Sequence, residues 1–126
     1  MIAEPGSGTA AAAWNGADGV ASSRILYPEA RAALAAAYRA KRIPPRSYAG
    51  RKKTFEELCL QMDVVEVSAS LAQAAGDLSE AHGLRGYDAM HLAAALLIGA
   101  DALVSADADL LTAAVAIGLP TVDASV

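Results

Sequence analysis

Three acidic residues from distant parts of the chain have the types and positions needed to form one reactive site: Glu29, Asp88 and Asp107. Each is predicted to lie near the start of a helix, and Asp107 also follows a short apolar run typical of a strand. In a parallel α/β sheet, the carboxyl ends of the strands and the starts of the following helices meet at one edge, where ligands bind. We therefore expect the three carboxylates to converge at that edge.

Carboxylates that converge need a cation between them. Two carboxylates about 4 Å apart repel each other by roughly 4 kcal/mol at an effective dielectric constant of about 20. A hard divalent cation such as Mg²⁺ or Mn²⁺ relieves that repulsion and prefers oxygen ligands. The three acids are therefore candidate metal ligands. Asp109 is either a fourth ligand or an exposed acid in the first turn of its helix.

Helical phase places all three acids on the apolar side of their helices, where an unpaired carboxylate is costly. A different interpretation is that Asp88 and Asp107 are helix N-caps, which the helix dipole favours. His91 lies one turn after Asp88. A hydrogen bond to the site or simple packing fits His91 better than ligation, because hard cations prefer oxygen. Ser105 precedes Asp107 by two residues and could hydrogen-bond a carboxylate or a phosphate.

The basic residues are concentrated in one segment, although the net charge of the chain is −4. Nine of the ten lie between Arg24 and Lys53, and the part of the chain after Gly86 contains none. One interpretation is a solvated helical hairpin, and the other is a basic arm that contacts phosphates opposite an acidic site. The candidate phosphate-binding residues are Arg46, Arg51, Lys52, Lys53 and, beside Asp88, Arg85, for which a plain surface role is the alternative.

The elements that must position these residues alternate between helices and short strands. Apolar periodicity predicts helices over residues 26–39, 47–61, 68–82, 87–98 and 107–117, with Ser68 or Ser70 as the cap of the third, and a short alanine-rich helix before residue 14. Short apolar runs predict strands over residues 20–22, 64–67, 102–104 and 120–122. Glycines 83, 99 and 118 are predicted to end helices. This alternation is typical of an α/β fold with a parallel sheet.

Composition excludes several other classes of protein. The chain has 126 residues, of which 55% are hydrophobic, 19% are charged and 32 are alanine, so we expect one packed, helix-rich domain. A single cysteine rules out an internal disulfide framework and a cysteine-rich zinc site. The longest apolar stretch, residues 89–100, is far shorter than the roughly 20 residues of a membrane span. The first residues lack the pattern of a signal peptide, so we expect no membrane association and a cytoplasmic location.

Three segments, in order, resemble those of PIN-domain ribonucleases. Leu84–Ala95 (LRGYDAMHLAAA) is similar to their "YDAxHLAAA" segment, and Leu103–Leu110 (LVSADADL) is similar to "LVTADxxL". Ser22–Leu34 (SSRILYPEARAAL) resembles the segment that carries their helical glutamate. The order and spacing resemble the toxin nucleases of VapBC-type toxin–antitoxin modules, and the resemblance covers nearly the whole chain.

This resemblance implies a PIN-like, three-layer α/β/α sandwich with a short parallel sheet. It implies that Glu29, Asp88 and Asp107 are the family's second, third and fourth acidic positions, which hold Mg²⁺ or Mn²⁺ and cleave RNA. It further implies a homodimer neutralised by a small antitoxin protein. The function expected is that of a metal-dependent endoribonuclease, the toxin component of a type II toxin–antitoxin system.

One departure from the family pattern matters for activity. The family opens with an apolar strand that ends in an acid, just before a segment like Ala3–Ser7 (AEPGS), whereas this chain starts at Met1. We therefore expect a single, N-terminally truncated PIN-like domain over residues 1–126, without the first strand and its Asp. The alternative function is a catalytically weak or inactive PIN-fold module that binds an antitoxin or RNA. A phosphate-receiver domain is a weaker hypothesis, because no lysine follows Lys53.

Overall fold

The computed structural model describes residues 12, 16–17 and 19–125. Along the chain its elements are β1 (Ala21–Ser23), α2 (Leu26–Arg39), α3 (Pro45–Cys59), β2 (Asp63–Val65), α4 (Ala69–His82), α5 (Gly86–Leu97), β3 (Leu103–Ser105), α6 (Ala108–Ala116) and β4 (Thr121–Asp123). The alanine-rich helix expected before residue 14 falls outside the described residues, apart from Ala12. Helices and short strands alternate as expected, so the α/β class is confirmed.

The four strands pair in parallel, as predicted, but in two separate sheets of two strands each. In the first, β1 pairs with β2, with Ser22 opposite Val64; in the second, β3 pairs with β4, with Val104 opposite Val122. Each strand is only three residues long. Within the described part of the chain no strand joins β1 to β3, so the two pairs do not form one continuous sheet.

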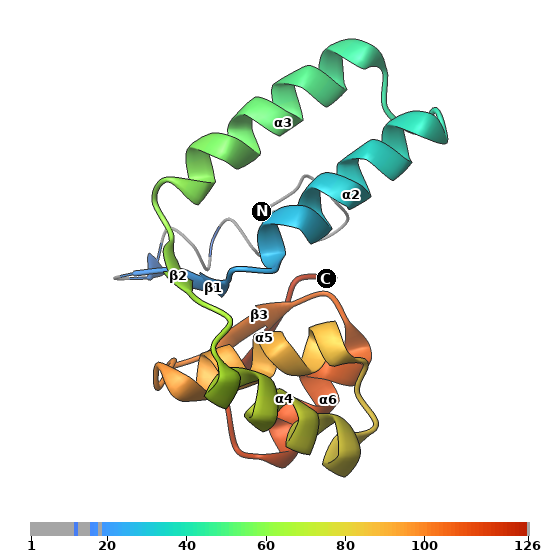
Figure 1. The fold of residues 1–126 in the computed structure, drawn as a ribbon. Coiled ribbons are helices and arrows are strands. Elements are labelled where there is room, and N and C mark those ends of the chain that lie inside the picture. The colour runs from blue at the N-terminus through green and yellow to red at the C-terminus, as the bar shows by residue number, and fades with distance from the viewer. Residues whose placement is uncertain (1–11, 13–15, 18, 126) are drawn as a thin grey trace.

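Helices α2 and α3 form an antiparallel hairpin on one side of the strands, while α4, α5 and α6 lie on the other (Figure 1). Aromatic pairs hold the hairpin at both ends. Tyr27 stacks on Phe55 with ring centroids 5.7 Å apart, and Tyr38 stacks on Tyr48 at 4.7 Å. The Tyr27 hydroxyl also donates a hydrogen bond to a carboxylate oxygen of Glu56 at 2.5 Å. The two helices of the hairpin are therefore held together at both ends.

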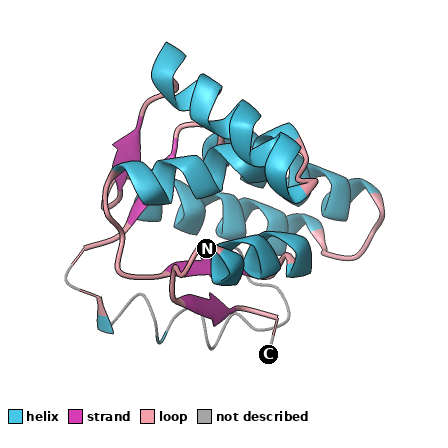
Figure 2. Ribbon diagram, turned by 90° about the horizontal axis from the view of Figure 1, so that it is seen from below, coloured by secondary structure: helices cyan, strands magenta, loops and turns pink. Residues whose placement is uncertain are grey.

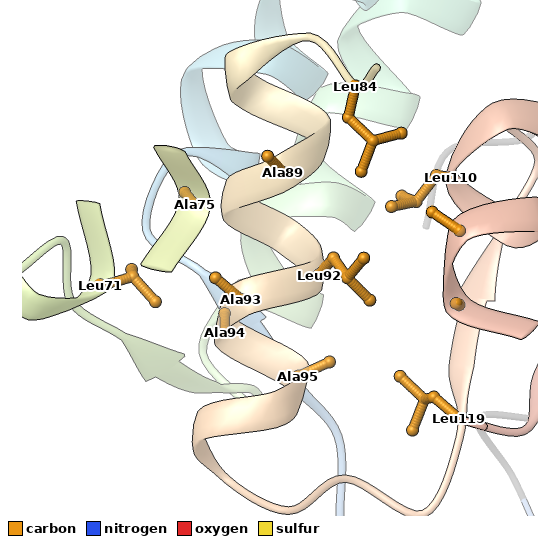
Figure 3. Close-up of a cluster of buried hydrophobic side chains, with 12 residues drawn as sticks. Leu71, Ala75, Leu84, Ala89, Leu92, Ala93, Ala94, Ala95, Leu110 and Leu119 are labelled. Carbon is orange, nitrogen blue, oxygen red and sulfur yellow. The ribbon is translucent and has the colours of Figure 1, made fainter. Parts of the chain in front are cut away.

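The main hydrophobic core surrounds α5, which lies between α4 and α6 (Figures 2 and 3). Alanines make up much of the buried surface of α5, and small side chains let neighbouring helices approach closely. The cluster consists of Leu71, Ala75, Leu84, Ala89, Leu92, Ala93, Ala94, Ala95, Leu110, Ala113, Ala114 and Leu119. Helix α5 also contacts β1, so it connects the core to the strand that precedes the hairpin.

Most of the predicted helix ends are confirmed. Ser68 caps α4 by accepting a hydrogen bond from the Leu71 N–H, and Gly83 follows that helix with a φ of 65°. The predicted range 47–61 for α3 is wrong at both ends, because the helix begins at Pro45 and ends at Cys59. Proline is tolerated in the first turn of a helix, where its missing N–H has no intrahelical partner to lose. None of the described helices is long and apolar enough to cross a membrane.

Candidate active site

Helix α5 places Asp88 in its first turn, where the carboxylate is mostly covered: only 14% of the side chain is exposed. The N-cap position of α5 is occupied by Arg85, whose side chain makes no capping hydrogen bond. The N-cap interpretation of Asp88 is therefore wrong. Because the neighbouring Ala89 is fully buried, the start of α5 is fixed by the core, and Asp88 is held at the edge of that core.

Asp107 is the N-cap of α6, so the capping interpretation is confirmed for this residue. Its Oδ1 accepts a hydrogen bond from the Leu110 N–H at 2.9 Å. Its own backbone N–H donates to the Ser105 hydroxyl oxygen at 3.0 Å, so Ser105 fixes the turn between β3 and α6. With one oxygen committed to the cap, the second oxygen, Oδ2, remains available for another partner.

The Arg85 guanidinium brings Asp88 and Asp107 together, although the two acids come from different helices. Its Nε lies 3.1 Å from Oδ2 of Asp88, and its Nη2 lies 3.3 Å from Oδ2 of Asp107. The hydrogen bond to Asp88, with the charges of both acids, raises the pKa of Arg85 above its ordinary value. The starts of α5 and α6 thus converge as the sequence indicated, and the Arg85 side chain lies against both carboxylates.

Glu29 reaches the same helix at a different point. Its Oε1 lies 2.7 Å from Nε2 of His91, which is one turn after Asp88 on α5. A carboxylate only accepts hydrogen bonds, so the Nε2–H of His91 donates. The hydrogen bond predicted for His91 is therefore present, and Glu29 is its partner. This contact joins the first turn of α2 to α5 across 62 positions of sequence.

The chemistry of the donors fits a hard divalent cation at the Asp88–Asp107 pair. Both are carboxylates, which such cations prefer, and they already lie on one positively charged group. As the side chains stand, no three His, Cys, Asp or Glu residues in the described part of the chain are grouped closely enough to hold a metal ion. The structure therefore brings Asp88 and Asp107 together, while Glu29 is paired with His91 instead.

The remaining predicted site residues lie on exposed or half-exposed surfaces. Asp109, in the first turn of α6, is exposed, as one of its two interpretations predicted. Its charge contributes to the raised pKa of Arg85. The four basic candidates of the hairpin all lie on α3: Arg46 and Lys53 are exposed, and Arg51 and Lys52 are half-buried.

Sequence reasoning missed two contacts. The first is the bridge that Arg85 makes between Asp88 and Asp107, which depends on how α5 and α6 pack. The spacing of three residues between Arg85 and Asp88 was the available signal for half of it. The second is an exposed ion pair between Arg24 and Glu66, which lie 42 positions apart, just after β1 and β2.

Comparison with known proteins identifies the family. The PIN domain family matches residues 2–116, which is most of the chain. This chain belongs to the PIN domain family. The resemblance drawn from its three motifs is thereby confirmed.

The relatives of this PIN domain include two proteins of Mycobacterium tuberculosis. One is ribonuclease VapC45 of strain CDC 1551 / Oshkosh, and the other is ribonuclease VapC49 of strain ATCC 25618 / H37Rv. Each is 44% identical to this chain over 106 residues, which cover 84% of this chain and 74% of the relative. The aligned length therefore includes most of the domain described above.

Proposed function

We propose that this PIN domain is a metal-dependent endoribonuclease that hydrolyses RNA phosphodiester bonds, as the toxin component of a type II toxin–antitoxin system. The observation that carries the proposal is the convergence of Asp88 and Asp107, from the starts of two helices, on the guanidinium of Arg85. The 44% identity to proteins named as VapC ribonucleases supports the same reaction.

Asp88 and Asp107 are the residues that would hold the metal, and Glu29 and Asp109 are the candidates for further ligands. The chemistry that a bound Mg²⁺ or Mn²⁺ would supply here is activation of water as a nucleophile and stabilisation of negative charge on the leaving oxygen. His91 orients Glu29 through their 2.7 Å hydrogen bond. Ser105 and the Leu110 N–H orient Asp107, which limits the directions in which its Oδ2 can point. No covalent link between enzyme and RNA is required.

The substrate would be bound by the hairpin and by Arg85. Arg46, Arg51, Lys52 and Lys53 lie on one helix, in a segment with a large excess of positive charge. A polyanion such as RNA is attracted to such a segment. Arg85, at the start of α5, lies against the two carboxylates and is the basic residue best placed to touch the phosphate that reacts.

The proposed protein partners are a small antitoxin and a second copy of the chain. Several large apolar side chains are exposed at the ends of α5 and α6, which favours a surface that a partner covers. They are Leu96, Leu97, Ile98, Val115 and Ile117. We place the protein in the cytoplasm, where its RNA substrate would be found, and assign residues 1–126 to one PIN-like domain.

Metal binding is the first test. The Tm should rise when Mn²⁺ or Mg²⁺ is added, because a ligand at a hundredfold excess over its Kd stabilises the folded state by about 2.7 kcal/mol. Asp88→Asn and Asp107→Asn should each remove most of that rise. Asp101→Asn is the matched control, since Asp101 is exposed and lies outside the pair. A double Asn variant that responds like the wild-type protein would show that the site is assigned wrongly.

One observation favours the alternative function, a binding module without nuclease activity: among the described residues, no third acid is grouped with Asp88 and Asp107. In that case the domain binds RNA or an antitoxin without cleaving RNA. Incubating a labelled single-stranded RNA with excess protein and Mn²⁺ separates the two functions. Cleavage that is abolished in Asp88→Asn supports the nuclease, whereas binding without cleavage supports the binding module.

A further inference from the structure

Arg85 is far more exposed than the two acids that it contacts. Its side chain is 80% exposed, compared with 14% for Asp88 and 31% for Asp107. It contacts the two acids through different nitrogens, Nε and Nη2, so one guanidinium serves both carboxylates at once. Arg85 precedes α5 in an extended conformation, and its side chain is not needed as a cap. It can leave the acids without uncovering the core.

Arg85 lies on the same two carboxylates that would hold a metal ion. It contacts Oδ2 of Asp88 and Oδ2 of Asp107. The other oxygen of Asp107 accepts the capping hydrogen bond from Leu110 and stays with α6. A cation held by the two acids would therefore compete with the guanidinium for the same carboxylates. Two positive groups cannot both lie between these carboxylates without strong repulsion.

We propose that Arg85 is a positioning residue that holds Asp88 and Asp107 together before metal binds and is displaced when a divalent cation enters. This inference rests on the proposed metal-dependent function. Its physical content is a competition: the guanidinium neutralises the two carboxylates, and the metal ion must replace it. A displaced Arg85 stays beside the site at the start of α5, where its five N–H donors become available to a phosphate.

Removing the arginine should have two effects of opposite sign. Without metal, Arg85→Ala should lower the Tm, because Asp88 and Asp107 then repel each other with no counter-charge. With metal, the same variant should bind Mn²⁺ about three- to tenfold more tightly, because no guanidinium must be displaced and a neighbouring positive charge is gone. The Mn²⁺-induced rise in Tm should therefore be larger than in the wild-type protein. A residue with a merely structural role would not strengthen metal binding.

The experiment is a calorimetric titration of the metal-free protein with MnCl₂, without RNA, together with thermal melts. Arg24→Ala is the matched control: it removes another exposed arginine, which pairs with Glu66 and not with Asp88 or Asp107. Its Mn²⁺ affinity should equal that of the wild type. Arg85→Lys keeps the charge but loses the fork of N–H groups, so its affinity should fall between those of the wild type and Arg85→Ala.

The outcomes separate the two proposals. Tighter binding in Arg85→Ala, abolished by adding Asp88→Asn, supports the displacement of Arg85. Wild-type binding that depends on Asp88 and Asp107 but is unchanged or weakened in Arg85→Ala overturns this inference and leaves the metal site standing. Wild-type protein that binds no Mn²⁺ in either assay overturns both.

Discussion

At the scale of single residues, His91 shows how this domain fixes a carboxylate from outside the site. The imidazole is mostly covered, with 20% of its side chain exposed, and it contacts Glu29 at 2.7 Å. Neither residue belongs to the Asp88–Asp107 pair, but His91 lies one turn along the same helix from Asp88. The position of Glu29 relative to that pair therefore depends on α5, through one hydrogen bond.

His91→Ala should weaken Mn²⁺ binding by about 10–100-fold, which is typical of losing a partner that orients a metal ligand. The physical reason is that Glu29 would be free to rotate toward water. His91→Gln should restore part of the affinity, because its side-chain amide can donate a hydrogen bond to Glu29. Mn²⁺ affinity, measured by calorimetry, is the deciding quantity.

His82→Ala is the control for this prediction. His82 is the other histidine of the chain and is exposed at the end of α4. Its removal should leave Mn²⁺ affinity unchanged. If His91→Ala binds Mn²⁺ as tightly as the wild-type protein, Glu29 needs no orienting partner or does not belong to the site.

At the scale of elements, α5 connects the site to the core. Arg85 precedes it, and Asp88 and His91 lie in its first turns. Its buried face consists of Leu92 and four alanines, and it packs against α4, α6 and β1. Leu92, next to His91, is fully buried among alanines and leucines (Figure 3). A substitution that shifts α5 in the core should therefore also shift Asp88, which lies on this helix.

Leu92→Ala should destabilise the domain by about 2–5 kcal/mol, because it removes buried methyl groups and leaves a cavity between α5 and α6. Leu97→Ala is the matched control on the same helix, since Leu97 is 62% exposed. It should change the free energy of unfolding by no more than about 0.5 kcal/mol. Urea denaturation measures both. Equal effects of the two substitutions would contradict the assignment of Leu92 to the core.

Helices were easier to predict than strands, and single contacts were hardest. Long apolar periodicities and terminal residues such as Ser68 and Gly83 are local signals, so the helices lie close to their predicted ranges. Strands of three residues carry little pattern, and each observed strand is displaced by about one residue from its predicted range. The division into two pairs depends on long-range hydrogen bonds that no local pattern encodes.

The site shows the same difference between what local patterns predict and what depends on tertiary packing. The convergence of Asp88 and Asp107 follows from the general rule for parallel α/β folds. The bridge by Arg85 does not, because it depends on the distance between two helix starts 22 positions apart. The end of α2 is a similar case. It is followed by Lys41 with a φ of 59°, a conformation that ordinarily indicates glycine.

At the scale of the whole molecule, the α2–α3 hairpin has an excess of positive charge, and the helices α4 to α6 have an excess of negative charge. The hairpin carries eight of the nine basic residues between Arg24 and Lys53, while α5, α6 and the strands beside them carry acids (Figure 1). Exposed positive charge extends to the far end of the hairpin, where Arg39 ends α2. At a rise of about 1.5 Å per residue, Arg39 lies about 15 Å along α2 from Glu29. An RNA chain could therefore contact the hairpin while one phosphate lies at the acids.

The orientation of α3 separates its basic residues into two pairs. Arg46 and Lys53 lie two turns apart on one face, opposite the buried Phe55. Arg51 and Lys52 flank the buried face and are half-covered. Only the first pair points fully away from the core. If the hairpin binds RNA as a basic arm, the first pair should make more of the ion pairs with phosphates than the second.

Salt dependence of RNA binding tests this difference. In an Asp88→Asn background that prevents cleavage, Arg46→Gln with Lys53→Gln should flatten the slope of log Kobs against log salt by about 1.4, because each neutralised phosphate of a single strand contributes about 0.7. Arg51→Gln with Lys52→Gln removes the same charge from the same helix and should flatten it less. Equal changes would mean that net charge alone attracts RNA, because a long-range field does not depend on which face of α3 carries the charge. Unchanged slopes in both double variants would show that the basic residues of the hairpin are only a solvated surface. RNA would then have to be bound by groups nearer the acids, of which Arg85 is the first candidate.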